Sequence, residues 1–117
     1  MAASPEYRDW VLEQLRGAGT VTGRAMFGGY GIYLDGLIIA LIASDTLYFK
    51  VDDSNRGDYE AQGMGPFRPY GEQGESMQYY EVPADVLEDR QELVSWAHRA
   101  AAVSRRAKSS KGRKKAD

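Results

Sequence analysis

Apolar residues recur with two different periods along this chain, and these periods predict helices at both ends with a sheet between them. Over residues 5–16 apolar side chains recur four positions apart, at Tyr7, Val11 and Leu15. That spacing places them on one face of a helix. Ser4 is a suitable N-cap, and Pro5 fits the first turn, where a missing N–H is not needed. Gly17 is expected to end this helix.

Four apolar runs follow, each of a length typical of β-strands. We predict strands over residues 21–27, 30–34, 37–43 and 46–51. The pair Asp35-Gly36 stands between two of these runs and predicts a tight hairpin, because glycine allows the positive φ that such turns require. Ser44-Asp45 is expected to form a second two-residue turn. In the run 37–43 both alternating sets are apolar, which indicates a strand covered at least in part on both faces.

The second half of the chain predicts further elements in a less regular pattern. We expect a short helix over 53–62 capped by Asp52 or Asp53, a loop over 63–76, a strand over 77–82, a helical turn after Pro83, and a last helix that begins near Asp89. The order is then helix, four strands, helix, strand, helix. Because hairpins connect the strands, we predict an α+β fold with two layers and a mainly antiparallel sheet of about five strands.

The apolar period stops after Ser104, and residues 105–117 are rich in Lys, Arg and Ser. We predict a folded domain over 1–104 and a disordered basic tail over 105–117. The basic residues of the tail are Arg105, Arg106, Lys108, Lys111, Arg113, Lys114 and Lys115. The tail has a net charge of +6 and the rest of the chain −8. Such a tail can contact phosphates without sequence selectivity, or it can serve solubility alone.

Residues that support catalysis or metal binding are scarce. The chain has no cysteine, which excludes disulfides and thiol chemistry and fits a cytoplasmic location. Its single histidine, His98, is expected at the surface of the last helix. The carboxylates are explained by helix ends and solvated faces. The N-terminus has no secretion signal, and no apolar run approaches a membrane-spanning length. We expect no catalytic residue, no metal site and no cofactor.

The stretch RAMFGGYGIYLDG, residues 24–36, raises the question of phosphate binding. A dinucleotide fingerprint needs a third glycine at a fixed spacing and a helix after it. Here Gly29-x-Gly31 continues to Leu34 and into a hairpin, so no helix N-terminus is available for a pyrophosphate. We interpret Gly28-Gly29 as a turn between strands, and Gly31 as a bulge or a close approach of two backbones.

Several aromatic and basic residues alternate along the predicted strands. An exposed sheet face is expected to hold Tyr33, Tyr48, and Tyr79 or Tyr80, with Arg24 and Lys50. Rings beside cations are typical of platforms that stack single-stranded nucleic acid. Cross-strand pairing of rings that stabilises the sheet explains the same pattern, and we favour this second interpretation.

The chain also resembles a known family. The residues of this resemblance include Arg24, Met26, Phe27, Gly28, Gly29, Gly31, Gly36 and Pro83. Over residues 6–104 the chain is similar to the N-terminal domain of the TfoX/Sxy family. The resemblance implies an α+β domain of bacterial regulators of natural competence, which are not known as enzymes and are thought to act with the cyclic-AMP receptor protein. Full-length regulators have a second, helical domain where this chain has its basic tail, so we expect a stand-alone N-terminal domain.

Three hypotheses of function follow. The first is a non-enzymatic regulatory domain that acts by protein contact with the transcription machinery; the resemblance implies the cyclic-AMP receptor protein or RNA polymerase as partner. The second is a nucleic-acid-binding module that uses the basic tail and the aromatic sheet face. The third and weakest is a small-ligand domain or enzyme with the loop 63–76 as a lid. Exposed strand edges allow either a monomer or a homodimer.

Overall fold

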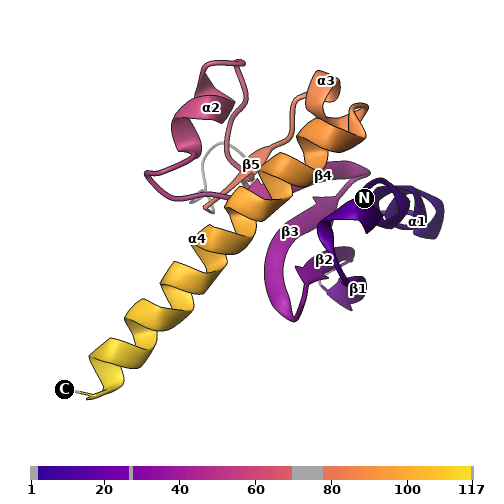
Figure 1. Ribbon diagram of the computed structural model, residues 1–117. Helices are drawn as coiled ribbons and strands as arrows, with labels where there is room; N and C mark the ends of the chain where they lie inside the picture. The colour runs from indigo at the N-terminus through magenta and orange to yellow at the C-terminus, as the bar shows by residue number, and fades with distance from the viewer. Residues whose placement is uncertain (1–2, 27, 70–77, 117) are drawn as a thin grey trace.

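The protein is described here by a computed structural model that covers residues 3–26, 28–69 and 78–116, with the backbone alone for 110–116. Its elements, in chain order, are α1 (Pro5–Gln14), η1 (Arg16–Ala18), β1 (Val21–Met26), β2 (Gly29–Leu34), β3 (Leu37–Ala43), β4 (Thr46–Lys50), α2 (Arg56–Glu60), β5 (Tyr79–Glu81), α3 (Ala84–Leu87) and α4 (Arg90–Ala116) (Figure 1). This order confirms the predicted α+β fold.

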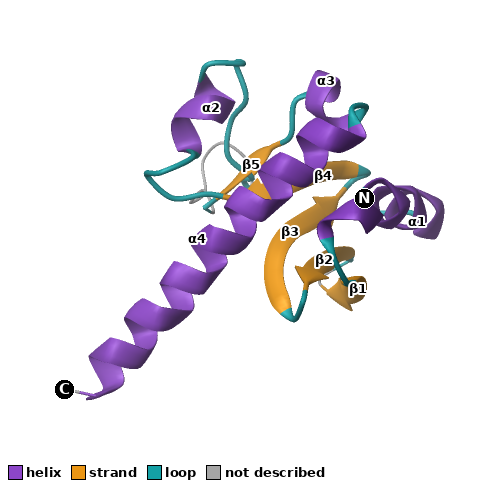
Figure 2. Cartoon of the chain, viewed as in Figure 1, coloured by secondary structure: helices purple, strands orange, loops and turns teal. Residues whose placement is uncertain are grey.

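The five strands form one antiparallel sheet in the order β1-β2-β3-β4-β5, so each strand pairs with its neighbour in sequence (Figure 2). The predicted hairpin at Asp35-Gly36 is confirmed, with φ of 50° and 85°. Ser44 and Asp45 form the second turn, also with positive φ of 50° and 53°. Positive φ at both central residues is typical of a type I′ turn, and the backbone twist of this turn matches the right-handed twist of the two strands that it connects.

α4 crosses one face of this sheet and encloses the core (Figure 1). Ile32, Ala40 and Phe49 lie side by side on β2, β3 and β4 and are fully buried. The matching stripe of α4 consists of Leu93, Trp96, Ala97, Ala100, Ala101 and Val103. α1 packs beside β1 through Val11 and Leu15, which are also fully buried. The second layer of the domain is therefore made mainly of the first and last helices.

The helix ends show how local sequence sets each start. The Ser4 hydroxyl accepts a hydrogen bond from the Tyr7 N–H, as expected for an N-cap. The Asp89 carboxylate accepts from the N–H groups of Gln91 and Glu92, which caps α4 as predicted. α2 is shorter than the predicted helix over 53–62, because the Asp52 side chain accepts the Ser54 N–H and folds the first residues into a turn.

The glycine stretch forms the β1–β2 turn, as predicted for Gly28, which has φ of 80°. Phe27 lies outside the described residues. The closest backbone approach is at Gly29 and not at Gly31, because a Cβ atom on Gly29 would lie 2.1 Å from the Ile42 carbonyl oxygen. The bulge is also displaced from Gly31: the register between β2 and β3 shifts after Ile32. These glycines therefore serve the packing of strands.

The predicted disorder of residues 105–117 differs from the structure, in which α4 continues to Ala116. Arg, Lys and Ala are good helix formers and the segment contains no proline. Extending a helix that is already packed also avoids the cost of nucleating a new one. The low hydrophobicity of residues 105–117 is therefore not enough to end α4 at Ser104.

The close approach at Gly29 yields a stability prediction. Gly29→Ala should lower the free energy of unfolding by more than about 2 kcal/mol, because its Cβ atom would overlap backbone that cannot move freely. Gly57→Ala is the matched control: it lies in α2 with open space around its Cβ position, so it should be neutral or stabilise by up to about 1 kcal/mol. Urea unfolding measures both, and equal effects would contradict the packing role of Gly29.

Candidate functional site

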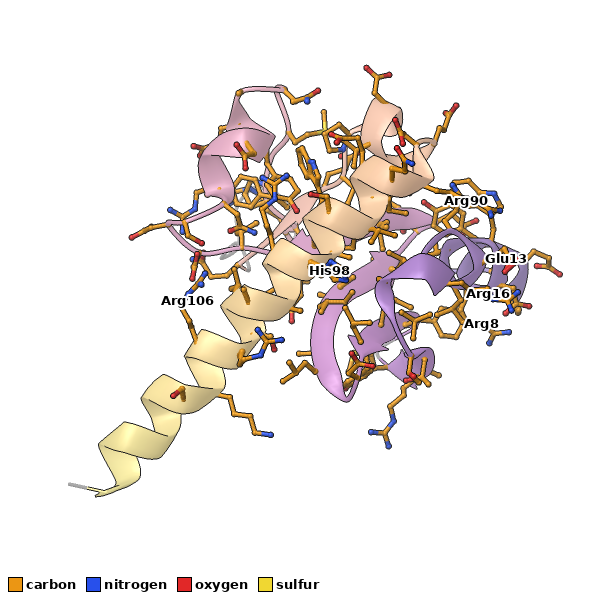
Figure 3. All side chains as sticks on the ribbon, in the orientation of Figure 1. Arg8, Glu13, Arg16, Arg90, His98 and Arg106 are labelled. Carbon is orange, nitrogen blue, oxygen red and sulfur yellow. The ribbon has the colours of Figure 1, made fainter. Side chains whose placement is uncertain are left out.

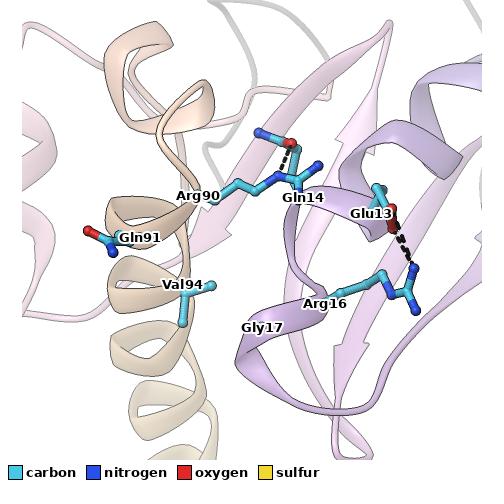
Figure 4. A pocket seen from close by; sticks show the side chains of 7 residues that line it. All are labelled: Glu13, Gln14, Arg16, Gly17, Arg90, Gln91 and Val94. Atoms are coloured by element: carbon cyan, nitrogen blue, oxygen red, sulfur yellow. Dashed lines mark hydrogen bonds and ion pairs between the residues drawn. The ribbon is translucent and has the colours of Figure 1, made fainter.

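A shallow groove of about 520 Å³ lies between the end of α1 with η1 and the first turns of α4 (Figure 4). It is lined by Glu13, Gln14, Arg16, Gly17, Arg90, Gln91 and Val94. Segments some eighty residues apart in sequence thus meet at one surface. We name it the α1–α4 groove.

Gln14 joins the two walls of the groove. Its side chain is only 7% exposed, which is unusual for a polar residue. The Gln14 Nε2 donates to the Leu87 carbonyl at 3.1 Å, and the Arg90 Nε donates to Gln14 Oε1 at 2.9 Å (Figure 4). One amide thereby fixes α1 against the connection between α3 and α4.

An ion pair lies in the groove, and an exposed ring lies farther back on α1. Arg16 and Glu13 approach to 3.0 Å, and both side chains are exposed (Figure 4). Trp10 lies one helical turn before Gln14 on α1 and is 40% exposed, the large apolar side chain most open to solvent among the described residues. Its ring lies 5.9 Å from that of Tyr7, centroid to centroid.

The groove lining has one acidic residue, Glu13, and two basic residues, Arg16 and Arg90, but the elements that surround it carry an acidic excess. Residues 5–18 and 84–94, which supply α1, η1, α3 and the start of α4, contain seven acidic and three basic residues. The C-terminal end of α4 lies at the opposite end of the molecule (Figures 1 and 3). The folded chain therefore separates an acidic end with a groove from a basic helical end.

The first residues of the basic segment are held against the domain. Arg106 donates from Nη2 to the Asp52 carboxylate at 3.0 Å and to the Ser54 hydroxyl at 2.7 Å. Seven residues earlier on α4, the Arg99 Nη1 atom lies 2.6 Å from the Asp58 Oδ2 atom. Partial burial would raise the pKa of Asp52, but hydrogen bonds from Ser54 and Arg106 outweigh it, so this pKa lies below its ordinary value.

The structure places only part of the predicted nucleic-acid contact set. Arg105 and Lys108 are exposed, without a hydrogen bond or ion pair to described residues, whereas Arg106 is paired. The side chains of Lys111, Arg113, Lys114 and Lys115 lie outside the described residues. These four belong to the helix by their backbone.

The predicted aromatic face lies on the side of the sheet away from α4. Strand register places Tyr33, Tyr48, Tyr79, Arg24 and Lys50 there, while Tyr80 is on the opposite face against Tyr59. The Arg24 guanidinium and the Lys50 ammonium each lie 5.8 Å from a ring, those of Tyr33 and Tyr79. Tyr79 is only 8% exposed, so its ring is not presented to a base. These contacts favour cross-strand stabilisation.

His98 and the possibility of a metal site were the remaining candidates for chemistry. His98 is exposed on α4, and its Nε2 lies 3.0 Å from the Ala18 carbonyl oxygen, which ties α4 to η1. The described residues contain no group of three side chains suited to hold a metal ion. Over the same part of the chain, none of the helices has both the length and the apolar character needed to cross a bilayer. The loop over 63–76 is described only up to Pro69, so half of the segment in the lid hypothesis lies outside the described residues.

Sequence reasoning did not identify Gln14 or Trp10. The only available signal for Trp10 was a large ring off the apolar stripe of its own helix. Gln14 had none, because its burial depends on a contact with Leu87, which is far away in sequence.

The antiparallel sheet covered by α4, the polar α1–α4 groove and the basic end of α4 together define a small α+β domain with a charged surface. A family model for the TfoX N-terminal domain matches residues 13–104. The chain belongs to this family of regulatory domains, which is linked to competence regulation in general and is not known as enzymatic. A comparison with curated proteins found no match.

The lowered pKa of Asp52 yields a prediction of pH dependence. A carboxylate with a depressed pKa stabilises the fold above its unfolded pKa, near 4, and this contribution is lost as pH falls through the folded value. Asp52→Asn should therefore lower the free energy of unfolding at pH 7, and the gap to the unmodified protein should close in acid. Urea unfolding across this pH range measures the gap; a gap that is constant with pH would contradict the role given to Asp52.

Proposed function

We propose that this protein is a cytoplasmic, non-enzymatic regulatory domain that acts by protein contact with the transcription machinery. The observation that supports this most directly is the family match over residues 13–104, which includes nearly all of the packed domain. RNA polymerase or the cyclic-AMP receptor protein is the proposed partner. A shared fold does not transfer a partner, so the surface itself must support the proposal.

The α1–α4 groove supports a protein as its occupant. Small-molecule sites are typically concave, largely apolar and able to enclose most of a ligand. This groove is shallow, and its polar side chains already bond to one another, as Gln14 does with Arg90 and Glu13 with Arg16. Such a polar surface, with an exposed Trp10 one helical turn before Gln14 on α1, resembles the mixed composition of protein–protein interfaces.

Direct binding tests this proposal. The immobilised full chain should bind purified RNA polymerase or the cyclic-AMP receptor protein in the micromolar range, as measured by biolayer interferometry. A domain from an unrelated family, immobilised at the same density, is the control for adsorption. Absence of binding to both proteins above that control would contradict the proposal.

A second candidate function is nucleic-acid binding, because α4 continues through the basic segment to Ala116. A preformed helix rich in Lys and Arg offers cations to phosphates with less ordering cost than a disordered tail. Arg105 and Lys108 show that the described part of this segment is open to solvent.

Truncation after Ser104 tests this second candidate. If the segment binds phosphates, the shortened chain should lose affinity for duplex DNA. The slope of log affinity against log salt, which is negative, should become less steep by about 0.9 for each lost phosphate contact. Fluorescence anisotropy over a salt series measures both quantities. An Arg105→Gln, Lys108→Gln variant of full length separates charge from length. Equal binding by the full and truncated chains would remove the segment from this role.

A further inference from the structure

We infer that the partner docks on the α1 surface around Trp10, and that it presents an apolar cleft rimmed by Lys and Arg side chains. The inference rests on the proposed function, protein contact, and adds to it a surface on this chain and a class of partner.

Trp10 is exposed on a helix that is itself held firmly. The ring is 40% exposed and leans on Tyr7 at 5.9 Å, with 31° between the ring planes. α1 is capped by Ser4, packed through Val11 and pinned at its end by Gln14. A large ring fixed before binding loses little conformational entropy on association, which is why Trp is enriched among residues that dominate binding energy.

The surroundings of Trp10 are acidic. Glu6 and Glu13 lie one helical turn before and after it on α1, and both are exposed. The bond from Gln14 to the Leu87 carbonyl joins α3 to the end of α1, and Asp85 on α3 and Glu88 after it are also exposed. Because opposite charges around an apolar centre speed encounter and exclude other partners, this surface fits a basic rim on the partner.

The same charge disfavours other occupants. Glu13 is paired with Arg16, but the excess of acidic over basic residues in 5–18 and 84–94 disfavours nucleic-acid phosphates and anionic lipid headgroups. A second copy of this chain has a basic segment over 105–117, but its only apolar residues are Ala107 and Ala116, which cannot form a cleft for an indole ring. A protein with its own apolar cleft is the occupant that fits.

Four variants test the inference against purified RNA polymerase and the cyclic-AMP receptor protein. Trp10→Ala should weaken binding at least about tenfold, whereas Trp10→Phe should retain most of it. Glu6→Lys should weaken binding most at low salt, because screening reduces the charge effect. Glu60→Lys is the matched control: Glu60 is exposed at the end of α2, which lies apart from α1 (Figure 1), and its change should leave affinity unaltered.

A second readout follows Trp10 in the unmodified chain and needs only the conservative Trp10→Phe variant as a reference. In the unmodified chain, binding should shift Trp10 emission to the blue and protect it from iodide quenching. Trp96 is buried on α4, and the Trp10→Phe variant gives its separate signal for subtraction.

The outcomes distinguish this inference from the function on which it rests. If the unmodified chain binds one of the two proteins and Trp10→Ala binds it within twofold with no protection of Trp10, the inference is overturned and protein contact stands. If the unmodified chain binds neither, both fail. Stronger binding by Glu6→Lys would overturn the basic rim, and Trp10-dependent self-association in sedimentation would replace the partner with a second copy.

Discussion

The packing of α4 across one face of the sheet is the contact on which the rest of the structure depends. Its stripe of small residues, Ala97, Ala100 and Ala101, lets the helix approach the strands closely, while Leu93 and Trp96 fill the space beside them. Phe49 on β4 is buried below this stripe. The apolar face of a sheet must be covered by another element, and in this chain α4 covers most of it.

This packing also sets where the two ends of α4 lie. Its first turn meets α1 through the bonds from Gln14, and this contact creates the α1–α4 groove. Farther along, Arg99 and Arg106 pair with Asp58 and Asp52 and hold the helix as it leaves the sheet. The acidic and basic ends are thus kept apart by one rigid element, so that each can meet a partner of opposite charge.

The sequence predicted well those features that depend on neighbouring residues. Asp35-Gly36 predicted a hairpin because the turn conformation is a local property, and the continuous apolar run over 37–43 predicted a strand. The boundary of α4 was mispredicted because helix propagation depends on the packed turns before Arg105, which composition alone does not report.

The site was less accessible to sequence reasoning than the fold. Gln14 is buried only because Leu87 and Arg90 come to lie beside it, and such contacts between distant segments leave no periodic signal. The aromatic pattern was read correctly as a face, but the distinction between Tyr79 and Tyr80 required the register of β4 with β5. The exposure of Trp10 likewise depends on which face of α1 packs against the domain.

Hydrogen–deuterium exchange of the full chain, alone and with purified RNA polymerase or the cyclic-AMP receptor protein, tests most directly the claim that the acidic end is the contact surface. The account predicts slowed exchange in α1 and in the connection from α3 to α4, with little change in β2 and β4. Slowed exchange confined to the sheet, with α1 unchanged, would contradict it.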